Sequence, residues 1–218
     1  MTVNLLKAGQ SIDLTKANAG LKNVTLGLRW GALVNKSPEQ RKEKTGILSR
    51  FFKGAQFTYK SAFEVPAVDV DSAVILVNED GQKIDRIYYA NRRCRGVLHA
   101  GDDLTGNDQY GEEDNEEIYI NLQNLRSDVK EIYVVANIFS GANDFSSSRL
   151  RGSYVRLLNS DSKEELVRYE LDEFKGMRGV ILGKLYRSKN EWSFKALGKG
   201  VKTGSISSIE SSILHDIK

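Results

Sequence analysis

The sequence predicts an all-β protein, an antiparallel β-sandwich of two sheets with a few short helices, one of them at the C-terminus. Two observations lead to this fold class. About ten short segments are apolar or alternate between apolar and polar residues, and turn-forming residues separate them. Strands and helices do not alternate in the way that builds a parallel sheet, and the only long helical period falls at the end of the chain.

Each expected strand is a run of apolar or alternating residues. In the segment 23–30, Val24, Leu26, Leu28 and Trp30 share one face, as in a half-buried strand. The segment 131–139 is almost continuously apolar, which is typical of a central strand. The expected strands cover residues 11–14, 23–30, 68–77, 84–89, 117–122, 131–139, 153–159, 165–171, 179–187 and 191–197.

The chain of 218 residues divides into one sandwich domain, 1–200, and a C-terminal extension, 201–218. Residues 198–204 are rich in Gly and Lys, like a linker. Within the extension, one apolar helical stripe is formed by Ile206, Ile209, Ile213, Leu214 and Ile217. This amphipathic helix could dock back on the sandwich, or it could mediate self-association or bind a partner.

A basic insertion, 35–62, interrupts the sandwich domain. It holds seven Lys or Arg against two Glu, and we expect a short amphipathic helix near Phe51 and Phe52. Basic charge beside two Phe suits an anionic membrane surface or a partner groove. The alternative is a solvated insertion that tucks both Phe side chains onto the core.

The residues 101–117 form an acidic loop with eight carboxylates and no Lys or Arg. Like charges at this density repel one another unless solvent, salt or a cation screens them. Three glycines allow the tight turns that could aim several oxygens at one point. Ca²⁺ takes about six to eight oxygen ligands in a flexible shell, so the loop is a candidate calcium site. A solvated acidic loop is the alternative.

A second pair of carboxylates lies on an expected strand. Asp69 and Asp71 point to the same face because side chains alternate along a strand, whereas Val68 and Val70 point to the other face. Two adjacent carboxylates are costly without a cation between them. If this face looks at the acidic loop, the pair completes an oxygen-rich cage; otherwise it is a half-exposed strand face.

Composition narrows the class of protein. Cys94 is the only cysteine, so no intramolecular disulfide forms, which fits a reducing cytoplasm. The two histidines are far apart and give no zinc-ligand spacing. We find no signal peptide and no apolar run long enough to span a membrane. The formal net charge is only +3, so a uniform nucleic-acid-binding surface is not indicated.

Several motifs together resemble the TerD family of bacterial tellurite-resistance and stress proteins. The matching segments are residues 24–30, 69–71, 79–81, 101–106, 114–116, 153–159, 183–187 and 191–194. The resemblance implies a non-enzymatic, calcium-binding β-sandwich linked to tellurite, phage and chemical stress resistance. It also implies cytoplasmic protein partners of the same resistance system, and a TerC-type membrane protein that would place the chain at the periphery of the inner membrane.

The resemblance also implies a set of ligands for one or two calcium ions. On the matching positions these ligands are Asp69, Asp71, Asp102, Asp103, Leu104, Gly106, Asp114 and Glu116, with Leu104 and Gly106 offering carbonyl oxygens. The sequence departs from the family pattern at Gly31, where an Asp is usual, and at Asp103, where an Asn is usual. The loop between Thr105 and Asp114 is also longer.

Two other functions remain open. The acidic residues could hold Mg²⁺ or Mn²⁺ for the hydrolysis of phosphate esters, with His99 as the nearest general base. A lone histidine is more often structural. The chain could instead be a scaffold at a membrane surface that uses the basic insertion and the C-terminal stripe.

Overall fold

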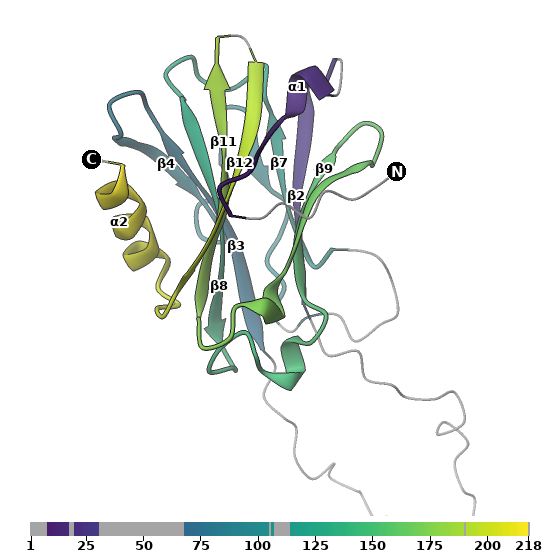
Figure 1. Ribbon diagram of the computed structural model, residues 1–218, viewed down its shortest axis with the longest axis vertical. Coiled ribbons are helices and arrows are strands. Elements are labelled where there is room, and N and C mark those ends of the chain that lie inside the picture. Colours follow the sequence, from purple (N-terminus) through teal and green to yellow (C-terminus); the bar gives the residue numbers. More distant parts are fainter. Residues whose placement is uncertain are drawn as a thin grey trace, which may run out of the picture.

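The computed structural model describes residues 8–17, 20–30, 68–104, 106, 114–189 and 191–217. The basic insertion 35–62, with its expected helix, and Gly31 lie outside these residues. The described chain forms two antiparallel sheets of six strands each, packed face to face (Figure 1). The predicted two-sheet β-sandwich is therefore confirmed.

The first sheet, called sheet 1, has the strand order β1-β12-β11-β8-β3-β4. Its strands are β1 (Ser11–Asp13), β3 (Asp69–Val77), β4 (Lys83–Ile87), β8 (Glu131–Ser140), β11 (Gly179–Ser188) and β12 (Glu191–Val201). The central strands β3 and β8 are buried over most of their length, as their continuous apolar sequences require.

The second sheet, called sheet 2, has the strand order β10-β9-β2-β7-β6-β5. Its strands are β2 (Asn23–Arg29), β5 (Arg93–Cys94), β6 (Val97–His99), β7 (Glu116–Asn121), β9 (Tyr154–Asn159) and β10 (Glu165–Glu170). The main core lies between the two sheets. Leu28 and Ile118 from sheet 2 and Val74 and Ile132 from sheet 1 are all fully buried in it.

The structure differs from the sequence prediction at four places. The segment 23–30 was expected to bury one face, but β2 is buried on both faces from Val24 to Leu28. Leu14, expected at the end of a strand, begins the short helix α1 (Leu14–Ala17). The short strands β5 and β6 were missed, because two or three residues are too few to show a period of two. Most of the expected linker 198–204 belongs to β12, which continues to Val201 and pairs with Gly179 of β11.

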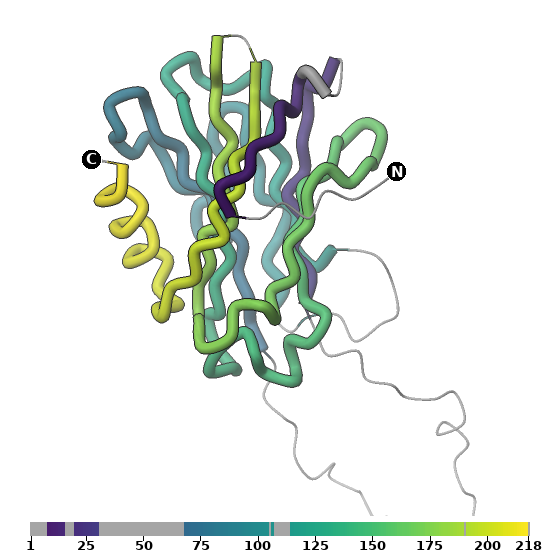
Figure 2. Tube along the Cα trace, in the orientation of Figure 1, coloured from purple at the N-terminus to yellow at the C-terminus, as the bar shows by residue number. Residues whose placement is uncertain are grey.

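The helix α2 (Ile206–Asp216) covers the outer face of sheet 1 (Figure 1). The chain turns back after β12 and runs along that face, as the tube in Figure 2 shows. Ile209 and Ile213 are buried in a second apolar cluster with Ile75 and Val135. The stripe thus packs on its own sheet, which is the first of the two alternatives for this helix.

Polar contacts hold α2 at its N-terminus and at its middle. Its N-cap Ser205 accepts a hydrogen bond from the backbone N–H of Ser208, as expected of a serine at this position. Glu210 forms ion pairs with Lys83 at 2.7 Å and Arg86 at 3.1 Å, both from β4. Two 3-10 helices, η3 (Ser148–Leu150) and η4 (Leu171–Glu173), lie in the connections that cross between the two sheets.

The docking of α2 can be tested with Ile213→Ala, which removes a side chain that is only 2% exposed. We expect the free energy of unfolding to fall by roughly 2–4 kcal/mol, because burial is lost and a cavity is left. The measurement is urea unfolding, with Ser208→Ala as the exposed control on the same helix. Equal stability of the two variants would show that the helix is not packed on the sheet.

Candidate metal centre

The site lies where β3 extends beyond its neighbour β4. The pairing of β4 covers only Val74–Val77, whereas β8 pairs with β3 along its whole length. The backbone N–H of Ser72 is therefore not used by β4. It donates instead to the carboxylate oxygen Oε2 of Glu116, at 2.8 Å, and the Ser72 hydroxyl donates to the same oxygen at 2.7 Å.

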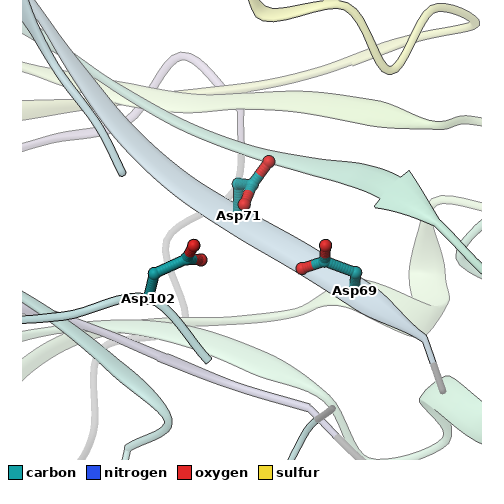
Figure 3. Close-up of side chains that lie close together, drawn as sticks. All are labelled: Asp69, Asp71 and Asp102. Carbon is teal, nitrogen blue, oxygen red and sulfur yellow. The ribbon is translucent and has the colours of Figure 1, made fainter. Parts of the chain in front are cut away.

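Three carboxylates converge at this end of β3. Asp69 and Asp71 come from the strand and Asp102 comes from the loop after β6, and one oxygen of each lies within 4.8 Å of the others. Figure 3 shows the three side chains turned toward a common space beside the strand. Asp69 and Asp71 are buried, with exposed fractions of 7% and 4%, while Asp102 is exposed and leaves the site open on one side.

Glu116 forms the wall of the site toward the sandwich interior. It lies at the start of β7 and is 1% exposed. His99, fully buried on the neighbouring strand β6, places its Nε2 atom 3.6 Å from Oε2 of Glu116. This histidine faces the carboxylate from inside the protein, so it has no direct access to a substrate.

Buried oxygens without a hydrogen-bond partner indicate what the site could hold. Within the described residues, Oδ1 of Asp69, Oε1 of Glu116 and Oδ1 of Asn137 are buried and accept no hydrogen bond. Asn137 lies opposite Asp71 in β8 and donates to its Oδ2 at 3.3 Å. Unsatisfied buried acceptors are costly. A hard cation would satisfy them, so this donor set fits a metal ion with oxygen ligands.

The carboxylates also carry strongly altered acidities. Burial, followed by the nearby negative charges of Asp102, Glu116 and Asp103, raises the pKa of Asp69 to about 6. Burial and the charge of Asp69 raise the pKa of Asp71 to about 7. The pKa of Asp102 is raised as well, by burial and by Glu116. Each shift shows that the ionised cluster is unfavourable on its own.

Three further predicted ligands, Asp103, Leu104 and Gly106, lie in the acidic loop just after Asp102. Oδ1 of Asp103 accepts from the Gly106 N–H at 3.2 Å, and Oδ2 accepts from the Asn115 side chain at 3.0 Å. Gly106 has a φ of +72° and lies so close to Trp30 that a Cβ would be 2.8 Å from the indole. Leu104 exposes 60% of its surface. These residues shape the loop around Asp102.

Asp114 is not among the three carboxylates that converge beside β3. Both of its oxygens accept from Nε of Arg156, at 3.0 and 3.1 Å, and its side chain is only 1% exposed. It lies directly over Gly27 of β2, where a Cβ would be 1.9 Å from Oδ2. The glycine in the 24–30 motif therefore makes room for a buried ion pair. The geometry gives Asp114 a structural role, and we leave it out of the proposed ligand set.

Sequence reasoning missed Ser72 and Asn137, which complete the walls of the site. The pairing of β8 with β3 would have indicated Asn137, because it places this residue opposite Asp71.

Cys94 is half-buried, and burial raises the pKa of its thiol to about 11, so its neighbouring arginines do not activate it.

The comparisons with known proteins agree with this fold. Residues 1–211 match the model of the TerD domain, and the chain belongs to the TerD family. It is 32% identical to the stress response protein SCP2 of Bacillus subtilis, over 89% of this chain and 91% of the relative. It is 31% identical to the tellurium resistance protein TerD of Serratia marcescens, over 94% of this chain and 93% of the relative.

A solved structure shows the same fold at lower sequence identity. It is a homologue of the telluride resistance protein TerD from Streptomyces coelicolor A3(2), with a TM-score of 0.62 and 15% identity. The match covers 86% of this chain and 95% of that chain. The chain therefore has the architecture of a family of tellurium-resistance and stress-response proteins.

The raised pKa values of Asp69 and Asp71 predict how the metal-free protein responds to pH. A carboxyl group whose pKa is higher in the folded state stabilises the fold below its unfolded pKa, and this stability is lost as the pH rises through the folded value. In EDTA, the thermal midpoint should therefore fall between pH 5 and pH 8. For a chain of this size, each kcal/mol lost lowers it by about 2–4 °C.

Asp71→Asn should flatten this pH dependence, because the amide does not ionise. Asp80→Asn, an exposed change in the β3–β4 turn, serves as the control and should keep the slope of the native protein. A midpoint that rises between pH 5 and pH 8 in the native protein would contradict the placement of these carboxylates.

Proposed function

We propose that this chain is a calcium-binding stress-response protein whose cation lies among Asp69, Asp71 and Asp102. The observation that carries the proposal is the convergence of three carboxylates within 4.8 Å, two of them buried. The unpartnered oxygen of Asp69 is an independent sign, because a buried acceptor at the centre of the cluster calls for a ligand.

The donor chemistry favours Ca²⁺ over transition metals. The candidate ligands are carboxylate and amide oxygens, which suit hard cations, and the cluster offers no thiolate or exposed imidazole. Ca²⁺ tolerates irregular shells of six to eight oxygens, whereas Mg²⁺ demands a near-ideal octahedron. A strand pair combined with a loop ligand fits the more flexible ion. The described residues offer one such centre, and a second ion would need residues of the acidic loop beyond Gly106.

Calcium binding would change the surface that the protein presents. The ion would neutralise the carboxylates and fix the loop around Asp102, so a partner would meet a different charge and shape. We propose that the chain acts through such metal-dependent contacts, in the cytoplasm, with other tellurite-resistance proteins and a TerC-type membrane protein. Self-association through α2 would use its exposed face, which includes Ser207, Ser208 and Ser211.

Two further observations bear on the alternatives. Among the described residues, the structure contains no helix with the length and apolar character to cross a bilayer. His99, the candidate base of a phosphate-ester hydrolase, has an exposed fraction of 0% and faces Glu116. A general base must reach the proton that it abstracts, so the geometry favours binding over hydrolysis.

The ligand assignment predicts opposite effects of Asp71→Asn with and without calcium. Without metal the variant should be more stable than the native protein at pH 7.5, because it removes repulsion from Asp69 and Glu116. With Ca²⁺ it should gain little, whereas the native protein at about a hundred times its Kd gains roughly 2.7 kcal/mol. The measurement is thermal unfolding in EDTA, Ca²⁺ and Mg²⁺.

Two variants control for this experiment. Asp102→Asn should also weaken calcium binding, since it removes the loop ligand. Asp114→Asn should lower stability in every buffer, because Arg156 loses one of its two carboxylate partners, but it should keep the response to Ca²⁺. Calcium responses that are unchanged in Asp71→Asn and Asp102→Asn would refute the proposed site.

A further inference from the structure

Large apolar side chains stand exposed beside the candidate calcium centre. Within the described residues, four large hydrophobic side chains are exposed, namely Leu98, Leu104, Tyr119 and Phe139. The two most exposed, Leu104 at 60% and Phe139 at 57%, belong to the segments that build the site. Side chains of this size cost free energy in water, and grouped near a site they indicate an interaction surface.

The positions of both residues follow from the site. Leu104 comes two residues after Asp102 in the same loop. Phe139 lies in β8 opposite the register shift between Asp69 and Val70. Its ring contacts Tyr89 edge-to-face, with centroids 5.9 Å apart. The carboxylates therefore have an exposed apolar residue on the loop side and an aromatic pair on the strand side.

A hollow of about 540 Å³ lies beside Asp71 of the cluster. Its lining also includes two basic residues, Arg178 and Lys202, and the start of α2. Neither basic residue forms an ion pair with a described carboxylate. Asn137 lines this hollow as well. A ligand here would meet positive side chains and the bound cation.

From these features we propose that the calcium-loaded site docks on an anionic phospholipid surface. Phosphate oxygens of a headgroup would complete the coordination of the cation, and Arg178 and Lys202 would bind the same headgroup or its neighbour. Leu104 and Phe139 would enter the interfacial region of the bilayer. The inference rests on the calcium site proposed above and names the partner of that site.

Charge makes this docking dependent on calcium. Without a cation, Asp69, Asp71 and Asp102 face the membrane with like charge, which repels anionic lipid. A divalent ion removes this repulsion and supplies the bridge. The exposed apolar side chains favour a lipid over an acidic peptide, because protruding side chains insert into a fluid layer, whereas a peptide needs an apolar groove to receive its own anchors.

The test is co-sedimentation of the full chain with vesicles. Vesicles of phosphatidylcholine alone are compared with vesicles that contain roughly 30% phosphatidylglycerol, each in Ca²⁺ and in EDTA. We expect sedimentation only with anionic vesicles in Ca²⁺. Free inorganic phosphate at millimolar concentration should not prevent it, because the apolar contacts require a bilayer.

Matched variants distinguish insertion of Leu104 and Phe139 into the bilayer from nonspecific adsorption of the protein to vesicles. Leu104→Ala combined with Phe139→Ala should lower the vesicle partition coefficient at least about tenfold, since two apolar anchors are lost. Leu98→Ala combined with Tyr119→Ala removes the other two exposed residues, which lie opposite each other in sheet 2, and should leave it unchanged. Lys202→Gln should weaken binding to anionic vesicles. Thermal midpoints check that all variants fold.

Calcium affinity is measured separately by titration calorimetry without vesicles. If the native protein binds Ca²⁺ but sediments with neither kind of vesicle, the docking proposal is wrong and the calcium site stands. The docking proposal is also wrong if both double variants sediment like the native protein. If the protein binds no Ca²⁺, the proposed function fails first and the docking proposal fails with it.

Discussion

The carboxylate of Glu116 links the two sheets at the end where β4 stops. One of its oxygens accepts both the backbone N–H and the hydroxyl of Ser72, so a side chain from sheet 2 replaces the missing strand beside sheet 1. Its other oxygen accepts no hydrogen bond. The same contact brings a buried negative charge next to Asp69 and Asp71. The candidate metal centre thus depends on how the sandwich satisfies the backbone of β3 where β4 leaves it unpaired.

Much of the fold followed from alternation along the strands. The apolar run of β8 predicts a central strand, and the structure has it as one. Alternation also located β2, but this strand is buried on both faces and not on one, because all five residues from Val24 to Leu28 are buried. The strands β5 and β6 were too short to show a period. The end of β12 was hidden by Gly198 and Gly200, which read as a linker, although backbone pairing with β11 continues to Val201.

The candidate site could be predicted only as far as local sequence reaches. Period-two alternation placed Asp69 and Asp71 on one face, and the structure brings Asp102 to them. The ion pair of Asp114 with Arg156 could not be foreseen, because the partner comes from β9, 42 residues later. The role of Asn137 likewise depends on the register between β3 and β8. Contacts between distant strands are set by packing, not by local pattern.

The most direct test of the calcium centre is a crystal structure of the protein grown with Ca²⁺. The account predicts an ion bound to oxygens of Asp69, Asp71 and Asp102, with distances of about 2.3–2.6 Å. Asp114 should remain paired with Arg156, as it is here. An ion held by Asp114 away from β3, or an empty cluster at saturating Ca²⁺, would contradict the account.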